Sequence, residues 1–437
     1  MASTAMLEQL EGLASPPQPS AAGEEAEEGV PPSPLAEPEP EPQEADMTPR
    51  THLSLFRSSE SVEPLDGGPA PLAPKPEPGS AAATAAAAAA LLPSDGNDAV
   101  PTGLTTRVKL ASTACNPCTP ATVFVHGLDS SKDTWQPVIQ DFVKAGYPCV
   151  ALDQRGHGET PIGDVADFGP DALAADILHA AAEHGINQPF ILVCHSMGGR
   201  IGMRCAAMDA QRVAKGLPPL LAALVIEDID VLVRPNPDPP DSELTEQQSA
   251  ELRRWESPEG RRFETLEACE QALLPWYGND KKRVRQWSTP NASTKIRVCH
   301  DGSGYWSDFN PAAKRLAIKR VLNHMDGAEA WTTMAAQARC EHEAAVSAAG
   351  GDAAFRASQT AGDTWSQYHC PVFLWISSPK GTVCTWEGEG GLNDMIAQFE
   401  GHAPGALSTK VYPGKYRPTR AVPYCFALIL DHRRVCG

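Results

Sequence analysis

The sequence predicts an α/β fold with a parallel sheet, and three observations support this prediction. Short apolar runs such as ATVFVHG (Ala121–Gly127) and PFILVCH (Pro189–His195) alternate with longer segments whose apolar residues have helical spacing. This alternation indicates β-α-β units with both faces of the sheet covered by helices. A charged, tryptophan-rich stretch over positions 231–369 interrupts the pattern, and a proline-rich, acidic stretch precedes it.

The predicted elements follow one another in a regular order. We expect strands at 121–127, 148–153, 189–195, 220–230, 370–376 and 407–413. We expect helices at 133–147, 171–186, 198–213, 391–399 and 422–434, and a helical insertion without a clear strand at 231–369. The resulting domain prediction is a tail at 1–104, a first core part at 105–230, the insertion at 231–369 and a last core part at 370–437.

The first hundred residues are predicted to be a disordered tail. They contain 17 of the 41 prolines, with 17 acidic and 3 basic residues, so 14 of the 19 net negative charges belong to them. Such a segment buries too little apolar surface to offset its chain entropy. The rest of the chain is nearly balanced and shows no basic stripe, which predicts no nucleic-acid partner. Within the tail, Arg50–Pro64 is a candidate docking segment for a protein partner.

The cysteines and the N-terminus favour an intracellular, cytoplasmic protein. Cys149, Cys194 and Cys205 lie in or beside predicted core segments, where a thiol behaves as a small apolar residue. The start of the chain has no secretory-signal pattern, and the alanine tract at 81–92 is too short to span a membrane. The single C-x-x-C pair, Cys115 and Cys118, lacks a second pair at zinc-site spacing. We therefore expect no metal and no cofactor.

The stretch CHSMG predicts a nucleophilic serine. Ser196 directly follows an apolar strand and precedes a helical pattern, and a sharp strand-to-helix turn exposes the serine Oγ at the edge of a sheet. Small residues two positions away, Cys194 and Gly198, allow close packing there, although glycine is more common at the first of them. An oxyanion hole needs two backbone N–H groups. We expect them from Met197 and Leu128.

At this point the chain resembles the α/β-hydrolase superfamily, in its lipase- and esterase-like branch. The segments VFVHGLDSSKDTW, VALDQRGHGET and ILVCHSMGGRIGMRCA have the order and spacing of the family's motifs. The resemblance covers residues 105–230 and, more loosely, 370–433. It implies an α/β-hydrolase fold: a doubly wound, mostly parallel sheet with a helical lid inserted after the strand LAALVIEDI. It also implies acyl transfer to water through a serine ester.

The partners of Ser196 are harder to find. The family places its acid after the strand PVFLWI, but residues 377–380 contain no carboxylate. Some members carry the acid at the end of the preceding strand, where this chain offers Asp228 and Asp230. Strand alternation puts these two on the same side. We favour Asp228.

The histidine is not identified. The family places it after the strand STKVYP, where this chain has Tyr416 and Arg417. His402 and His432 lie at the wrong places, and His195 is expected to face away from the site. Either the C-terminal sequence is a variant gene model, or the lid supplies a histidine, at position 300 or 324, or the protein is a non-catalytic binder. We predict a serine hydrolase that acts on a small-molecule ester, with a catalytically impaired binding protein as the alternative.

Overall fold

The computed structural model describes the chain in nine segments. These are residues 106–109, 120–144, 146–186, 188–233, 241–288, 295–299, 301–358, 368–377 and 384–412. The predicted tail, the Cys115–Cys118 pair and the predicted closing helix lie outside the described residues.

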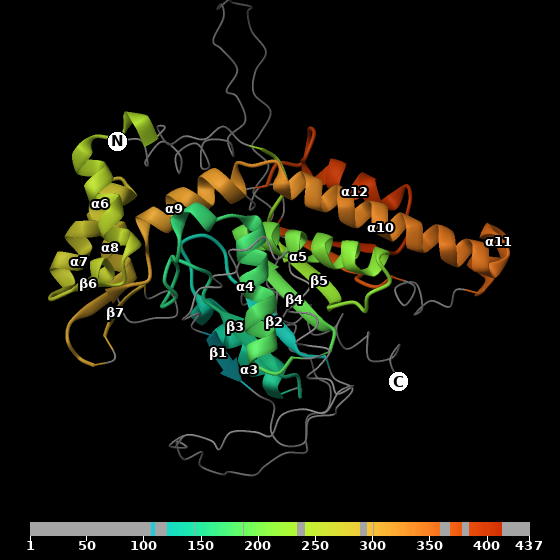
Figure 1. Cartoon of the computed structure of the whole chain (residues 1–437), viewed down its shortest axis with the longest axis horizontal. Helices are drawn as coiled ribbons and strands as arrows, with labels where there is room; N and C mark the ends of the chain where they lie inside the picture. Colours follow the sequence, from blue (N-terminus) through green and yellow to red (C-terminus); the bar gives the residue numbers. More distant parts are fainter. Residues whose placement is uncertain are drawn as a thin grey trace, which may run out of the picture. The chain divides into compact units, whose positions relative to one another are not determined.

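A seven-stranded sheet forms the centre of the described chain (Figure 1), in the order β1-β3-β2-β4-β5-β9-β10. Its strands are β1 (Thr106–Lys109), β2 (Thr122–Val125), β3 (Cys149–Leu152), β4 (Phe190–His195), β5 (Leu221–Glu227), β9 (Val372–Ser377) and β10 (Leu407–Tyr412). All neighbouring pairs are parallel except β1 with β3. The predicted α/β fold with a mostly parallel sheet is therefore confirmed, and β1 is an antiparallel edge strand that the apolar pattern did not reveal.

Helices cover both faces of this sheet. Alternate residues of β2 enter two separate hydrophobic cores, with Val123 and Val125 in one and Phe124 in the other. The first core is closed by α4 (Pro170–Glu183), α5 (Met197–Ala214) and α12 (Leu392–Glu400). The second is closed by the 3-10 turn η1 (Lys132–Trp135) and α3 (Gln136–Lys144). A further 3-10 turn, η2 (Val165–Asp167), precedes α4.

The insertion is not purely helical, so the prediction that it contains no clear strand is wrong. The strands β6 (Arg262–Phe263), β7 (Ile296–Val298) and β8 (Tyr305–Ser307) form an antiparallel sheet in the order β6-β8-β7. Strands of two or three residues are too short to show a period of two, which explains the error. The remaining elements are η3 (Asp241–Glu243), α6 (Glu246–Glu256), η4 (Glu259–Arg261), α7 (Leu266–Leu273), η5 (Leu274–Tyr277), α8 (Lys281–Ser288), α9 (Pro311–Ala317), the π-helical η6 (Ile318–Leu322), α10 (Asp326–Ala349) and α11 (Asp352–Ser358).

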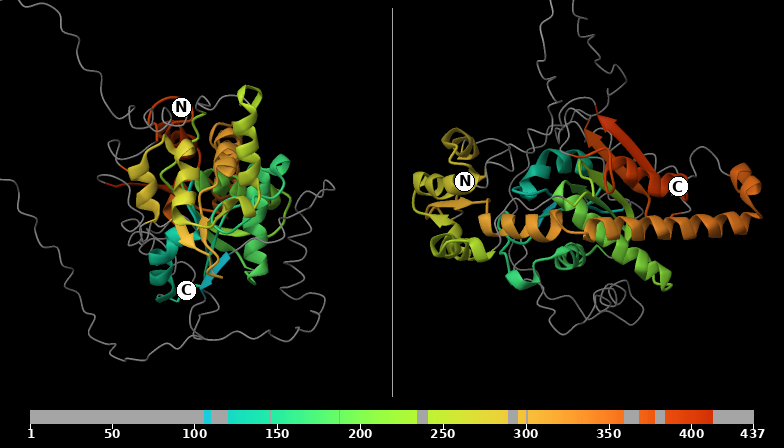
Figure 2. Two further views of the ribbon diagram at one scale, coloured as in Figure 1. Left: turned by 90° about the vertical axis from the view of Figure 1, so that its left-hand side faces the viewer. Right: turned by 90° about the horizontal axis from the view of Figure 1, so that it is seen from above.

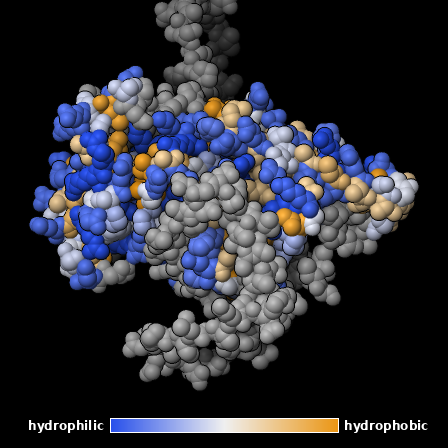
Figure 3. Space-filling view, in the orientation of Figure 1, coloured by the Kyte–Doolittle hydropathy of each residue, from blue (hydrophilic) through white to orange (hydrophobic). Residues whose placement is uncertain are grey.

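The 24-residue helix α10 extends along the sheet domain in the right view of Figure 2 and attaches the insertion to that domain. Its Trp331 is fully buried, lies 4.9 Å from the ring of Phe399 and donates its indole N–H to the carbonyl of Met395. Trp331 thus packs α10 onto α12. Hydrophilic residues cover much of the surface of α6, α7 and α8 (Figure 3). Within the described segments, no helix is both long enough and apolar enough to cross a membrane.

Candidate active site

Ser196 lies in a strained turn between β4 and α5. Its backbone has φ 51° and ψ −122°, a conformation that costs a residue with a side chain about 1–3 kcal/mol. The turn is held from both sides, because the N–H of Ser196 donates to the carbonyl of Glu227 at 2.8 Å and its carbonyl accepts from Gly199 at 2.7 Å. Ser196 remains partly exposed, whereas Met197 is fully buried. A strained, accessible serine on a rigid support is the arrangement that a nucleophile requires.

Three glycines let the chain segments around Ser196 approach one another. A Cβ on Gly198 would lie 2.6 Å from the carbonyl oxygen of His126, and a Cβ on Gly127 would lie 3.1 Å from the Cβ of Ser196. The loop after β2 therefore lies directly against the turn that carries Ser196. Cys194, which occupies a position where glycine is more common, fits because its Sγ faces Gly202 of α5, where a Cβ would be 2.6 Å away.

We expect Gly198→Ala to lower stability by about 1–3 kcal/mol, because its methyl group would meet the backbone carbonyls of Val125 and His126. Helix α5 must then move away from β2, which also shifts the turn that carries Ser196. Gly401→Ala is the matched control, since Gly401 has helical φ −75° and ψ −17° and a Cβ there meets nothing closer than 3.8 Å. Thermal unfolding of both variants tests this; an equal unfolding midpoint for the two variants would contradict it.

The two backbone amides expected to form the oxyanion hole flank Ser196. Met197 is the first residue of α5, so its N–H is one of the groups that an α-helix leaves without an internal partner. Leu128 follows Gly127 in the loop after β2 and packs partly buried against the core. Within the described part of the chain, neither N–H donates to a protein acceptor. Two backbone N–H groups next to a serine are the type of donor that an oxyanion hole requires.

Asp228 and Asp230 have different surroundings. His195 of β4 pairs with Glu227 of β5, so Ser196 and Asp228 occupy the next positions on adjacent parallel strands. Asp228 has φ 54°, is 6% exposed, and accepts a contact of 3.8 Å from the thiol of Cys384.

Asp230 is fully buried and fixed in structural contacts. Its carboxylate lies 3.6 Å from the guanidinium of Arg200 and accepts the N–H of Thr385 at 2.7 Å and that of Leu232 at 3.2 Å. Through these contacts Asp230, which follows β5, connects α5 to the segment before α12. Of the two carboxylates, Asp228 is the one whose strand position lies beside Ser196.

Three histidine rings lie in or beside the loop after β2. A Cβ on Gly127 would lie 2.9 Å from Nδ1 of His195, so this ring lies against the loop. His126 accepts the N–H of Gln154 on Nε2 at 3.1 Å and contacts the carbonyl of Gly127 through Nδ1 at 2.8 Å, which places its proton on Nδ1. The ring of His157 is 5.3 Å from that of His126.

All three imidazoles are predominantly neutral at neutral pH. Burial lowers the pKa of His195 to about 4. Burial, and then His157, hold the pKa of His126 well below its usual value, and burial also lowers the pKa of His157. His324 and His402 are exposed, on other parts of the chain. The expected acid position at 377–380 begins at the last residue of β9, and its residues 378–380 lie outside the described residues. The histidine position at 416–417, His300 and His432 also lie outside them.

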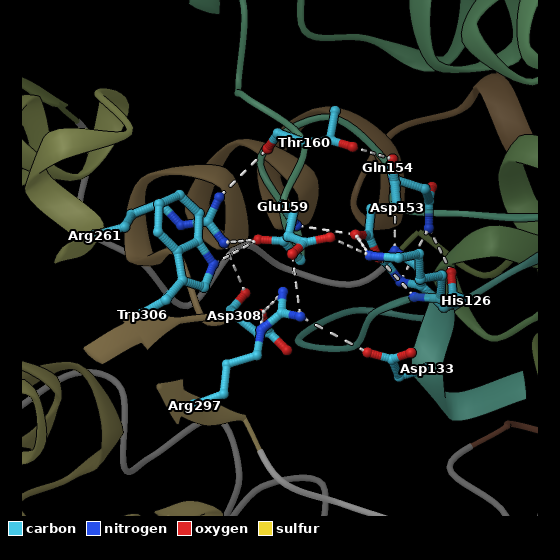
Figure 4. A network of polar contacts seen from close by, with 12 residues as sticks. His126, Asp133, Asp153, Gln154, Glu159, Thr160, Arg261, Arg297, Trp306 and Asp308 are labelled. Atoms are coloured by element: carbon cyan, nitrogen blue, oxygen red, sulfur yellow. Dashed lines mark hydrogen bonds and ion pairs between the residues drawn. The ribbon is translucent and has the colours of Figure 1, made fainter. Parts of the chain in front are cut away.

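A buried polar network joins the insertion to the loop after β3 (Figure 4). Glu159 lies at its centre and contacts Lys132 at 2.7 Å and Arg297 at 3.3 Å. Lys132 also contacts Asp153 at 2.7 Å, and Arg297 contacts Asp308 at 2.8 Å.

Two further side chains of the insertion bind the backbone of the same loop. Arg261 donates to the carbonyls of Gly158 and Thr160, and Trp306 donates its indole N–H to Gly158 at 3.0 Å. Burial raises the pKa of Asp308 to about 6. No group of three or more His, Cys, Asp or Glu residues in the described segments is arranged to hold a metal ion. The contacts of Arg261, Arg297 and Trp306 thus hold the insertion over the loop.

Sequence reasoning did not find this network. Arg261 and Gly158 are 103 positions apart in the chain, and each charge taken alone has the appearance of an ordinary surface residue. The only sign of it in the sequence was the polar string QRGHGE after β3. Arg155 of this string pairs with Asp176 of α4 at 2.6 Å. That pair, together with the contact of His157 Nδ1 to the carbonyl of Arg155 at 3.1 Å, is local and structural.

Comparisons with known proteins agree with this architecture. The model of the alpha/beta hydrolase family matches residues 122–399, which is more than half of the 437 residues. A non-heme chloroperoxidase CPO-A1 of Kitasatospora aureofaciens is 41% identical over 78 residues, or 18% of this chain and 27% of that protein. The sn-1-specific diacylglycerol lipase ABHD11 of Danio rerio is 31% identical over 108 residues, or 24% of this chain and 31% of that protein. The protein phosphatase methylesterase 1 of Schizosaccharomyces pombe is 36% identical over 93 residues, or 19% and 27%.

The chain thus spans about a third or less of the length of these three relatives. Among solved structures, a marine microorganism esterase aligns with a TM-score of 0.42 and 16% identity, covering 76% of this chain and 98% of that one. The match of the family model confirms the resemblance that the three sequence motifs indicated. The chain belongs to the alpha/beta hydrolase family.

Proposed function

We propose that the protein is a serine hydrolase that cleaves a carboxylic ester, or a thioester or amide, through an acyl-enzyme on Ser196. The observation that carries this proposal is the backbone of Ser196, with φ 51° and ψ −122° at the junction of β4 and α5. Strain of this kind persists only where the surrounding structure enforces it, and it concentrates at functional sites. Two of the relatives, a diacylglycerol lipase and a methylesterase, are named for the cleavage of esters, which supports this class of substrate.

In the proposed reaction, Ser196 Oγ attacks the carbonyl carbon and its proton passes to a base. The N–H groups of Met197 and Leu128 stabilise the negative charge on the carbonyl oxygen. Collapse of the tetrahedral intermediate breaks the bond to the alcohol, which leaves with the proton, and water then cleaves the acyl-serine ester. Asp228 is the proposed acid that orients the base. In this proposal the insertion is the lid over the site.

A fluorophosphonate probe tests the proposal without knowledge of the natural substrate. We expect the full-length wild type to be labelled on Ser196, and Ser196→Ala to remain unlabelled. Ser347→Ala is the matched control, because Ser347 is an exposed serine of α10, and we expect it to be labelled like the wild type. Labelling of Ser196→Ala, or no labelling of a folded wild type, would contradict the proposal; the second result would favour a binding protein that lacks catalysis.

A further inference from the structure

The loop that carries Leu128 is fixed at both ends by polar contacts. At its start, His126 is held by Gln154, whose amide Nε2 donates to the carbonyl of His126. At its end, Lys132 is attached to Asp153 by its backbone N–H at 2.7 Å and by Nζ at 2.7 Å. Asp129, directly after Leu128, has a left-handed backbone with φ 53°, which apart from glycine is tolerated best by Asp and Asn.

The contacts of the Asp129 side chain come from two elements of the insertion. Oδ1 accepts the hydroxyl of Tyr277, the last residue of η5, at 2.9 Å. Oδ2 lies 2.8 Å from Nζ of Lys314, in α9. The same ammonium lies 4.1 Å from the centroid of the Tyr277 ring, so the three groups contact one another. We call Asp129, Tyr277 and Lys314 the loop latch.

Both partners in the insertion are well supported. Tyr277 is 3% exposed, and its ring centroid lies 4.9 Å from that of Phe309. Burial, together with the neighbouring Asp129, raises the pKa of Tyr277 well above its usual value, so the phenol keeps its proton and donates. Lys314 and Asp129 are 14% and 20% exposed, so their ion pair is largely shielded from solvent. The contacts of Asp129 with Tyr277 and with Lys314 are therefore better ordered than an exposed ion pair on the surface.

We propose that the insertion positions the oxyanion hole: Tyr277 and Lys314 hold Asp129 and thereby aim the N–H of Leu128 at the oxygen that becomes charged on Ser196. This inference rests on the proposed function. Tyr277 and Lys314 are positioning residues, because they act through Asp129 and do not touch the reacting atoms. The insertion would then do more than cover the site, since the N–H donors that stabilise the transition state would be correctly placed only while the insertion holds Asp129.

The latch predicts a specific kinetic defect. Loss of one oxyanion donor lowers kcat by about 10²–10³, so partial misplacement of Leu128 in Tyr277→Phe/Lys314→Met should lower it at least about tenfold. Methionine keeps the apolar stem of Lys314 and removes the charge. We expect the KM for p-nitrophenyl butyrate to stay within about twofold of the wild type, since an oxyanion donor acts mainly in the transition state. Phosphonylation of Ser196 should slow in parallel, because the phosphonate oxygen occupies the same hole.

Controls separate positioning from loss of structure. Tyr368→Phe is the matched control, because Tyr368 is also buried and its hydroxyl donates to the carbonyl of Pro404 at 2.8 Å, outside the loop latch. It should leave kcat unchanged, and Lys314→Arg, which keeps the positive charge, should retain most of kcat. Asp129→Asn and Lys314→Met break the same ion pair, so their combination should be no slower than the slower single variant.

Several results would overturn the latch. These are an unchanged kcat in folded Tyr277→Phe/Lys314→Met, a change in KM alone, and losses of Asp129→Asn and Lys314→Met that multiply. In each of these cases a labelled wild-type Ser196 leaves the serine-hydrolase proposal intact. If wild-type Ser196 is not labelled at all, the proposed function fails, and the catalytic role of the latch fails with it.

Discussion

Replacement of Ser196 by glycine is expected to abolish ester hydrolysis and, at the same time, to raise the stability of the protein. The loss of the nucleophile should lower kcat by about 10⁶-fold, the size of effect that follows removal of a catalytic serine. The gain in stability has a separate cause. With φ 51° and ψ −122°, Ser196 is in a conformation that glycine adopts readily and other residues avoid. Relief of about 1–3 kcal/mol of strain should outweigh the greater chain entropy of glycine, about 0.5–1 kcal/mol.

A change in stability of the opposite sign is expected for Ser347→Gly, which makes the same substitution in the exposed last turn of α10. There the backbone is helical, and glycine should lower stability by about 0.5 kcal/mol without changing hydrolysis. Chemical denaturation of the two variants and the wild type, together with initial rates on p-nitrophenyl butyrate, measures both effects. A Ser196→Gly variant that is less stable than the wild type would show that the turn is not strained.

Most of the sheet domain could be predicted from the sequence because its central strands are apolar and buried on both sides. The runs TVFV and FILVCH are fully buried apart from the last residue of the second, so hydrophobicity alone marks β2 and β4. The turn at Ser196 could be predicted for a related reason. A nucleophile at a strand-to-helix junction needs small neighbours, and Gly198 stands where any Cβ would meet the backbone of β2.

The polar half of the candidate site could not be predicted in the same way. Asp129 meets Tyr277 and Lys314 across 148 and 185 positions of the chain, and no local pattern marks a pair of side chains that far apart. The choice between Asp228 and Asp230 had the same difficulty. Strand alternation puts both on one side, and only the position of Arg200 shows that Asp230 is engaged. Charged residues take their roles from their neighbours in space, whereas apolar residues reveal theirs by spacing along the chain.

The two carboxylates should therefore respond differently to the same substitution. Asp228→Asn is expected to lower kcat by roughly 10⁴-fold, as loss of the charge that orients a catalytic base does elsewhere. Its stability should change little, because asparagine tolerates the left-handed backbone that Asp228 has at φ 54°. Asp230→Asn should instead cost about 3 kcal/mol of stability, because it leaves the buried guanidinium of Arg200, 3.6 Å away, without its opposite charge.

This pair of variants decides whether Asp228 acts on chemistry or on structure. Hydrolysis by Asp230→Asn should return toward that of the wild type at temperatures well below its unfolding transition, whereas hydrolysis by Asp228→Asn should stay low at every temperature. The measurements are kcat at two temperatures and the midpoint of thermal unfolding. Full activity in Asp228→Asn would exclude it as the acid and assign that role to a carboxylate elsewhere in the chain. A loss of stability in Asp228→Asn equal to that in Asp230→Asn would show that both carboxylates serve the fold.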